Sequence, residues 1–367
     1  MHKIIGTALG KTVRHLASLR GGGGQALPGL VVERLFPSYL GKMLAQLPEG
    51  IVIITGTNGK TTTTKMVVEL LQANGKKVMT NPTGSNFTRG IISSLTHQAK
   101  LSGRLPFDVG VFELDEAYAR QFVLQIKPRW VLALNVMRDQ LDRFGELDTA
   151  ANMIGATMHE ALEGIITNND DARLTAMAEM ILHNHNKKGI YFGVHKNLRP
   201  FFPVDDELHG VSRPAPHHAR SVELTAFKDQ ETAFRFGHGV HAAQLQLSGQ
   251  HNFQNAAAAL ALVHELLPKI PPQTLVAQLA TVKPAFGRGE LFTLKNGATL
   301  QLILVKNPAG FRQSLASYLV ADHDIMIAIN DNYADGRDTS WLWDVPFDSL
   351  KNKPIALTSG TRAADMA

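Results

Sequence analysis

The chain has 367 residues and contains no cysteine. This absence excludes disulfides, thiolate zinc sites and a cysteine nucleophile in this chain, and it is compatible with a reducing cytoplasm. Aromatic residues make up only 7% of the sequence, and no basic run is interleaved with them. We therefore expect no nucleic-acid partner. No apolar segment is long enough to span a membrane.

The rest of the composition is that of an ordinary globular protein, with 44% hydrophobic and 19% charged residues. The net charge of +5 and the pI near 9.3 favour an anionic substrate or a membrane surface. The N-terminal segment lacks the apolar core of a secretion signal, because Lys11, Arg14 and Arg20 interrupt it. Its apolar residues recur at helical spacing. We expect a helix that docks on the protein or, alternatively, lies near a membrane.

Apolar strand candidates alternate with helical patterns, which predicts an α/β fold with a parallel sheet that binds ligands at the carboxyl ends of its strands. We expect a helical segment at 1–47, a central domain at 48–283 and a smaller Rossmann-like domain at 284–367. An irregular insertion at about 193–222 interrupts the central domain. The expected strands are 51–55, 108–113, 130–135, 164–167, 189–192, 299–305, 324–329 and 354–358, and a strand-like alternation spans 222–248. The expected helices include 30–47, 62–73, 255–267 and 309–320.

A glycine-rich turn between an apolar run and a helical pattern predicts a phosphate-binding loop. Its glycines allow backbone N–H groups to turn toward phosphate oxygens, and the following helix N-terminus adds partial positive charge. The lysine can reach the β- and γ-phosphates, and the next hydroxyl suits Mg²⁺. The sequence therefore predicts binding of ATP and Mg²⁺ by Gly56, Thr57, Asn58, Gly59, Lys60, Thr61 and Thr62.

Acidic residues follow the strand expected at 108–113. Glu113 ends this strand, so its carboxylate can hold Mg²⁺ beside Thr61. Asp115 and Glu116 come next and either cap the following helix or, for Glu116, contribute to the metal site. Two polar loops, 81–90 and 135–146, also follow strands. The first of them contains Arg89, a candidate contact for phosphate or carboxylate.

These motifs together resemble the Mur ligase family. The resemblance rests on residues 56–62, Glu113, the segment Asp139-Gln-Leu-Asp-Arg143, and Gly249-Gln-His-Asn-Phe-Gln-Asn255 before an alanine-rich helix. It implies an ATP-dependent enzyme that forms amide bonds through an acyl-phosphate. It also implies that Asn252 and Asn255 lie by the adenine and that Arg288 approaches the phosphates.

Further motifs are similar to one branch of this family, the ligase-like subunits of lipid II isoglutaminyl synthase. They are residues 81–86, 113–116, 138–146, 306–310 and, most specifically, 331–344. This resemblance implies ATP-dependent amidation of the D-glutamate α-carboxylate in the lipid II stem peptide, which gives D-isoglutamine. The ammonia would come from a partner glutaminase of the GatD type. The lack of cysteine fits this division of work, because glutaminases of that class use a cysteine nucleophile.

The same resemblance implies that Asp338 completes the catalytic triad of the partner glutaminase, where a carboxylate fixes the imidazole tautomer. The alternative is that Asp338 caps a helix starting at Thr339. Asp335 and Asp344 are the other candidates for the triad position.

The sequence departs from the family pattern in three ways. Related proteins often carry a four-cysteine zinc ribbon in the central domain, whereas this chain has only scattered histidines there, so we expect no zinc. Relatives continue beyond the equivalent of residue 367, which predicts a shortened C-terminal domain. No lysine occurs in 144–163, where many amino-acid-adding Mur ligases carry a carbamoylated one.

Two other functions are compatible with these residues. One is a Mur or folylpolyglutamate-type ligase that adds an amino acid to a carboxylate. The other is a nucleotide-dependent scaffold that regulates a glutaminase without chemistry of its own. For the amidating enzyme we expect a cytoplasmic location, at the inner face of the membrane where its lipid-linked substrate resides.

Overall fold

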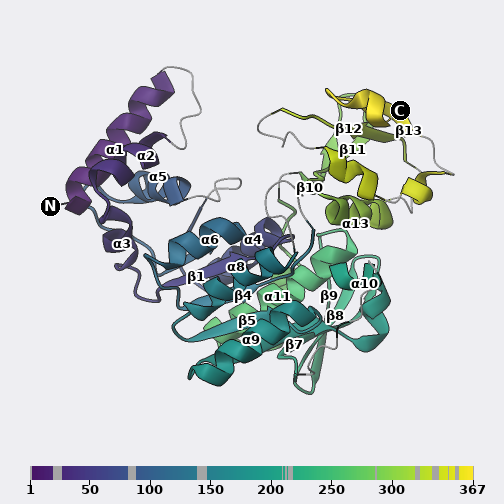
Figure 1. Ribbon diagram of the computed structural model, residues 1–367, viewed down its shortest axis with the longest axis horizontal. Coiled ribbons are helices and arrows are strands. Elements are labelled where there is room, and N and C mark those ends of the chain that lie inside the picture. The colour runs from purple at the N-terminus through teal and green to yellow at the C-terminus, as the bar shows by residue number, and fades with distance from the viewer. Residues whose placement is uncertain are drawn as a thin grey trace.

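The computed structural model describes residues 2–19, 27–81, 88–138, 147–208, 210, 213, 218–285, 287–318, 323–332, 339–345, 347–351 and 355–366. Three parts follow one another along the chain. A helical N-terminal part and a C-terminal part lie at opposite ends of a large central sheet (Figure 1).

Nine of the described strands form one sheet in the order β2-β3-β1-β4-β5-β6-β7-β8-β9. Its strands from β2 to β7 are parallel, and β7, β8 and β9 continue as an antiparallel meander. All five residues of β1 are buried, as expected for a parallel strand that is covered on both faces. The strands are β1 (Ile51–Thr55), β2 (Val78–Thr80), β3 (Val109–Glu113), β4 (Trp130–Ala133), β5 (Gly164–Asn168), β6 (Lys188–Val194), β7 (Val222–Lys228), β8 (Glu231–Phe236) and β9 (Gly239–Gln244).

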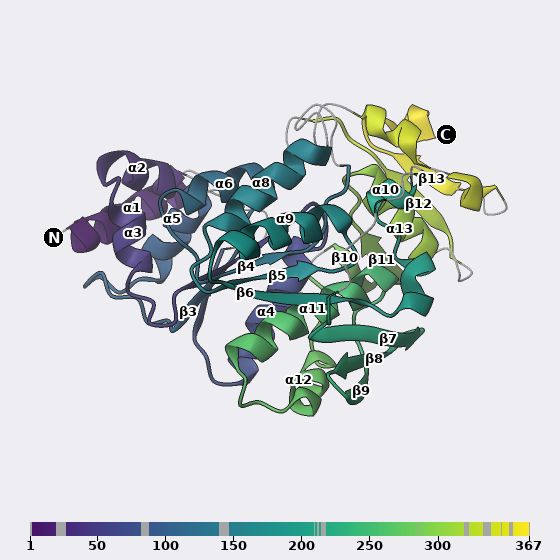
Figure 2. The ribbon, with the colours of Figure 1, turned by 60° about the horizontal axis from the view of Figure 1, so that its bottom comes forward.

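Helices cover both faces of the sheet and build two hydrophobic cores (Figure 2). One core lies under α4 (Lys60–Ala73), α11 (Gln250–Leu266) and α12 (Pro272–Leu279). The other lies under α6 (Glu116–Val123), α8 (Leu147–His159) and α9 (Ala172–Asn184). This arrangement confirms the prediction of a parallel α/β fold.

The N-terminal part consists of α1 (His2–Leu19), α2 (Leu27–Leu35) and α3 (Tyr39–Leu44), which pack with α5 (Thr88–Gln98). Small residues allow close packing here. A Cβ on Gly6 would lie 2.6 Å from the Tyr39 ring, and one on Gly10 would lie 2.5 Å from Thr96. The single helix expected at 30–47 is two helices, because the chain leaves helical conformation around Pro37.

The C-terminal part has two small sheets. β10 (Arg288–Thr293) pairs antiparallel with β11 (Thr299–Ile303), and β12 (Ile325–Ala328) pairs parallel with β13 (Ile355–Ser359). Helix α13 (Pro308–Tyr318) packs on the second sheet together with the 3₁₀ helices η2 (Ser340–Asp344) and η3 (Phe347–Leu350), and η4 (Ala363–Met366) follows β13. The predicted strands 299–305, 324–329 and 354–358 and the predicted helix 309–320 are confirmed, whereas β10 in this part and β2 in the central sheet were not predicted. Within the described residues, no helix combines the length and apolarity needed to cross a bilayer.

Candidate functional site

The predicted phosphate-binding loop lies between β1 and α4, at the carboxyl edge of the sheet. Gly56 and Gly59 have φ values of 129° and 88°, which side chains rarely adopt. At Gly59 a Cβ would also lie 2.3 Å from Asn255 Oδ1. Lys60 Nζ donates to the carbonyls of Gly56 and Thr57, so the amine lies inside the turn of the loop. The local geometry is that of a phosphate cradle.

The segment that follows β4 holds the loop in place. Asn135 exchanges two hydrogen bonds with Asn58: its Oδ1 accepts from the Asn58 amide at 2.9 Å and its Nδ2 donates to the Asn58 carbonyl at 3.0 Å. The Met137 amide donates to Thr57 Oγ1 at 3.1 Å. On the far side of the segment, Asp171 Oδ2 accepts from the Val136 amide at 2.8 Å. Two neighbouring strand ends therefore fix the loop.

A hydroxyl and a carboxylate face each other where Mg²⁺ was expected. Thr61 Oγ1 donates to Glu113 Oε1 at 3.1 Å, and Glu113 is only 2% exposed. Asn81 binds both backbone groups of Glu113, accepting from its amide and donating to its carbonyl, each at 3.0 Å. Asn81 thereby fixes the strand end that presents the carboxylate.

Burial raises the pKa of Glu113, whereas the hydrogen bond from Thr61 and the nearby cations oppose the increase. The cations are Lys60, Lys306 and Arg288. A buried carboxylate beside a hydroxyl oxygen is the donor set that Mg²⁺ prefers. These residues therefore fit the ion, and Thr61 and Glu113 are the side chains that would hold it.

The N-terminus of α11 forms another wall of the site. Asn255 lies against Gly59, while Asn252 is buried and donates to the Ser248 carbonyl at 2.7 Å. Their predicted adenine contacts stay predictions. His251 lines the same cleft, and its pKa is lowered to about 4 by burial and by Arg288, so its ring is neutral at pH 7.

The C-terminal part closes the cleft from the opposite side. Asn307 Nδ2 donates to Asn58 Oδ1 at 3.1 Å, and Asn307 Oδ1 accepts from the Gly310 amide at 2.7 Å at the start of α13. Arg288 begins β10 and lines the cleft with Lys306. The cleft is thus lined by the phosphate loop on one side and by Arg288, Lys306 and Asn307 on the other.

Sequence reasoning missed three residues that line this cleft and one that holds its loop. Their signals were nevertheless in the sequence, because each lies in or directly beside a segment already singled out. They are Asn135, which ends a strand candidate, His251, which precedes the first asparagine of its motif, and Lys306 and Asn307, which open the segment 306–310.

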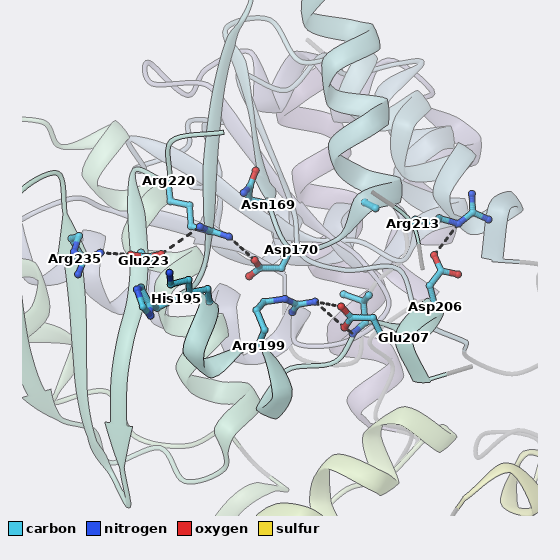
Figure 3. A pocket seen from close by; sticks show the side chains of 13 residues that line it. Asn169, Asp170, His195, Arg199, Asp206, Glu207, Arg213, Arg220, Glu223 and Arg235 are labelled. Atoms are coloured by element: carbon cyan, nitrogen blue, oxygen red, sulfur yellow. Dashed lines mark hydrogen bonds and ion pairs between the residues drawn. The ribbon is translucent and has the colours of Figure 1, made fainter. Parts of the chain in front are cut away.

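A second cavity of about 430 Å³ lies at the carboxyl ends of β5 and β6 (Figure 3). It occupies the region of the expected insertion, which begins with η1 (Lys196–Phe201) and α10 (Asp205–Leu208). The lining arginines have carboxylate partners: Arg199 donates to both oxygens of Glu207, at 2.7 and 2.8 Å, and Arg213 lies 3.0 Å from Asp206.

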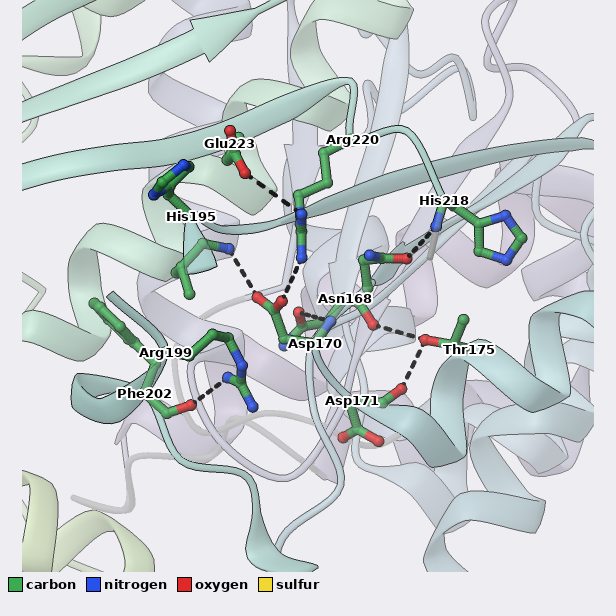
Figure 4. A network of polar contacts seen from close by, with 12 residues as sticks. Asn168, Asp170, Asp171, Thr175, His195, Arg199, Phe202, His218, Arg220 and Glu223 are labelled. Atoms are coloured by element: carbon green, nitrogen blue, oxygen red, sulfur yellow. Dashed lines mark hydrogen bonds and ion pairs between the residues drawn. The ribbon is translucent and has the colours of Figure 1, made fainter. Parts of the chain in front are cut away.

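An ion-pair chain connects this cavity with the sheet (Figure 4). Asp170 Oδ2 accepts from the Val194 amide at 2.7 Å, and its Oδ1 lies 2.8 Å from Arg220 Nη2. Glu223 bridges Arg220 and Arg235, at 3.4 and 2.7 Å. Among the residues that the structure describes, no three His, Asp or Glu side chains form a metal site. Paired charges thus cross-link the expected insertion with the strand ends of the sheet.

Several other predicted residues lie apart from the cleft or outside the described part. Arg89 is on α5, where its Nε lies 2.9 Å from Glu33 of α2. Glu116 is buried in the first turn of α6, and Asp344 ends η2. Asp335, Asp338 and most of the loop 135–146 lie outside the described residues.

Comparisons with known proteins agree with this geometry. The Mur ligase middle domain model matches residues 54–263, and the MurT ligase C-terminal model matches residues 304–367. The MurT subunit of lipid II isoglutaminyl synthase from Streptococcus pneumoniae is 30% identical, covering 96% of this chain and 83% of the relative. The chain belongs to the MurT family. Its counterpart from Staphylococcus aureus (strain COL) is 28% identical over 98% of the chain and 85% of the relative.

Solved structures show how the MurT family chain relates to other Mur ligases in fold. MurF from Acinetobacter baumannii superimposes with a TM-score of 0.66 at 19% identity, covering 90% of this chain and 67% of that chain. MurF from Thermotoga maritima, solved with ADP, also gives 0.66 at 17% identity and covers 89% and 74%. The predicted Mur ligase fold is confirmed.

Proposed function

We propose that this MurT family chain is the ATP-dependent subunit of a lipid II isoglutaminyl synthase. In the proposed reaction the α-carboxylate of D-glutamate in the lipid II stem peptide attacks the γ-phosphorus of ATP, and ADP leaves. Ammonia then attacks the acyl carbon, the bond to phosphate breaks, a proton is lost and D-isoglutamine forms. The similarity to MurT subunits over nearly the whole chain supports this reaction.

The observation that carries the proposal is the Thr61–Glu113 pair beside Lys60. Burial of a carboxylate is unfavourable unless a cation balances its charge. A chain that only regulated a glutaminase would therefore gain nothing from a buried Glu113 at the carboxyl edge of the sheet. Mg²⁺ held there would neutralise charge that develops on the transferred phosphoryl group.

The remaining charged side chains of the cleft have related tasks. Lys60 and Arg288 bring positive charge to the phosphate cradle, and the backbone N–H groups of 56–60 orient the phosphates. Asn307 ties the C-terminal wall to the loop. We infer that closure of this wall excludes water, which would otherwise hydrolyse the acyl-phosphate.

The ammonia source in this proposal is a glutaminase partner of the GatD type. The chain contains no cysteine, so it cannot supply the nucleophile of that reaction itself. Asp338 is the residue that we propose to complete the partner's triad. Because the substrate is lipid-linked, the proposed place of work is the cytoplasmic face of the membrane.

The test is amidation by the purified full chain supplied with Mg²⁺-ATP, a lipid II stem containing D-glutamate, and ammonium chloride. We expect mass spectrometry to detect conversion of one carboxylate to a carboxamide. With the glutaminase and glutamine as nitrogen source, Asp338→Asn should lose amidation, yet it should keep the ammonium-dependent reaction. If the product carries an added amino acid instead of a carboxamide, the chain is a Mur-type amino-acid ligase and the proposal is wrong. ATP hydrolysis at a rate that does not depend on the stem peptide would contradict both the amidation and the ligase function.

A further inference from the structure

Three successive backbone N–H groups after β4 are each bonded to a side chain from a different part of the chain. The pairs are Val136 with Asp171 at 2.8 Å, Met137 with Thr57 at 3.1 Å, and Arg138 with Asp205 at 3.0 Å. The first acceptor precedes α9, the second belongs to the phosphate-binding loop, and the third begins α10 in the expected insertion. The insertion therefore contacts the same short segment that holds the phosphate-binding loop.

Asp205 is buried, with an exposed fraction of 3%, although α10 has only four residues. Besides the hydrogen bond from the Arg138 amide to its Oδ1, its Oδ2 lies 3.5 Å from Arg138 Nε. A buried carboxylate is unfavourable unless hydrogen-bond donors and a cation satisfy it, and Arg138 supplies one of each. These two contacts fix the place and the direction of the backbone at residue 138.

The position of Asp205 depends in turn on how α10 is attached to the protein. Asp206, the next residue, pairs with Arg173 of α9, whose side chain is 11% exposed. Glu207 instead accepts two hydrogen bonds from Arg199 of η1, so its pair stays within the insertion (Figure 3). A four-residue helix has little stability of its own. The buried pair with α9 therefore connects α10 to the body of the central domain.

Met137 connects Arg138 to the nucleotide cleft. Its carbonyl accepts from Thr57 Oγ1 at 3.2 Å, and its amide donates to the same oxygen at 3.1 Å. Thr57 is among the described residues that line the nucleotide cleft, and Asp205 is not. Backbone N–H groups bind phosphate best when the protein already holds them in the right orientation before the ligand arrives. The segment 136–138 is thus a direct link between the insertion and these groups.

We propose that Asp205 is a positioning residue for the phosphate-binding loop. It holds the backbone of Arg138, so that Met137 keeps Thr57 and the neighbouring N–H groups of the loop in the orientation that binds phosphate oxygens. The proposal rests on the proposed function in one respect, because it requires the loop to bind ATP.

Calorimetry of the full chain with Mg²⁺ and a non-hydrolysable ATP analogue tests this role. Asp205→Ala should weaken binding of the analogue about tenfold or more, because the Arg138 amide loses a charged acceptor. Asp205→Asn keeps an acceptor oxygen at the same place, so it should restore the affinity to within about threefold of the unchanged chain. Unchanged affinity in Asp205→Ala would overturn the proposal, and so would equal losses in the two variants.

Glu207→Ala is the matched control. It removes a carboxylate from the same helix, but one that is 48% exposed and paired only within the insertion. The control should bind the analogue as the unchanged chain does. If Glu207→Ala weakens binding as much as Asp205→Ala, the effect belongs to the insertion as a whole and the proposal fails. If Asp205→Ala does not fold, Asp205→Ser replaces it, since its hydroxyl is one atom too short to reach the amide.

A double-mutant cycle distinguishes positioning of the loop from a general loss of stability. Thr57→Val removes both contacts between Met137 and the loop. If Asp205 acts through Met137, Asp205→Ala should weaken binding much less in the Thr57→Val background than in the unchanged chain. Losses that simply add would show that the two residues act independently and would overturn the proposal.

These measurements need neither the stem peptide nor a glutaminase, which keeps them separate from the amidation test. An unchanged chain that binds no analogue would contradict the proposed function and the positioning role together. An unchanged chain that binds, with Asp205→Ala binding equally well, would overturn the positioning role alone. A chain that shows the expected Asp205 effect but forms no carboxamide would contradict the proposed amidation alone.

Discussion

The pairing of Asp170 with Arg220 makes a specific prediction about stability. The Asp170 side chain is 1% exposed and that of Arg220 is 18% exposed, whereas Arg235 at the outer end of the same chain of charges is 41% exposed. Replacing Arg220 leaves a buried carboxylate with only the Val194 amide as a hydrogen-bond donor. We expect Arg220→Met to lower the free energy of unfolding by about 3–5 kcal/mol, the cost of breaking a buried pair.

Arg235→Met is the control, because it removes a cation from the same ion-pair chain at an exposed position. Glu223 keeps Arg220 as a neighbour at 3.4 Å in this variant. The expected loss is about 0–1 kcal/mol, as for other exposed ion pairs. For a domain of this size the two variants should lower the melting temperature by roughly 6–20 °C and by less than about 4 °C, respectively.

Guanidinium-induced unfolding, followed by far-ultraviolet circular dichroism, measures the difference. A double variant, Asp170→Asn/Arg220→Met, should recover part of the loss because the buried charge is gone. The reasoning is refuted if the two single variants are equally stable, or if the double variant is less stable than Arg220→Met. Gly193 gives a related geometric constraint, since its Cβ would lie 2.6 Å from both Arg220 Nε and Asp170 Oδ2.

The remaining predictions concern the nucleotide cleft. Lys60→Ala should reduce substrate-dependent ATP hydrolysis by about 100-fold or more through loss of transition-state charge stabilisation, with an unchanged melting temperature; a phosphate-release assay measures it. Because burial raises the pKa of Glu113, protons should compete with Mg²⁺ at higher pH than for an ordinary glutamate. Apparent Mg²⁺ affinity should therefore fall as the pH is lowered through this pKa, and calorimetry of Glu113→Gln should show weak binding without that dependence. Gly59→Ala should lower the free energy of unfolding by about 1–3 kcal/mol and weaken nucleotide binding, because the φ of residue 59 is 88° and the new Cβ would clash with Asn255. Gly75→Ala, with a φ of 82° and no atom within 4 Å of its Cβ, carries only the backbone cost and should bind nucleotide normally.

The features of the fold and site that the sequence predicted best are those encoded by residues next to one another in the chain. The phosphate loop needs glycines, a lysine and a hydroxyl at fixed spacing between a strand and a helix, so its position followed directly from 51–73. Glu113 was also found, because a carboxylate that ends a buried strand lies at the ligand-binding edge of a parallel sheet.

The features that were not predicted depend on contacts between residues that are far apart in the sequence. No local pattern indicates that Asn307 reaches Asn58, 249 positions earlier, or that Asn135 holds the loop. The irregular insertion expected at about 193–222 contains Arg220, and only the fold shows that Arg220 pairs with the buried Asp170. Strand β2 was missed because it has only three residues.

Helix α11 has a consequence for how the chain is made on the ribosome. It packs against α4, β5, β6 and β7, all of which are synthesised before it. Until α11 emerges, nascent strands such as β5 and β6 keep one apolar face open to water, a situation that favours aggregation. The alanine-rich sequence of α11 forms helix readily and offers a nearly uniform apolar surface, with Ala256 to Val263 all buried. Emergence of this one helix should therefore cover the apolar face that the strands made before it leave exposed.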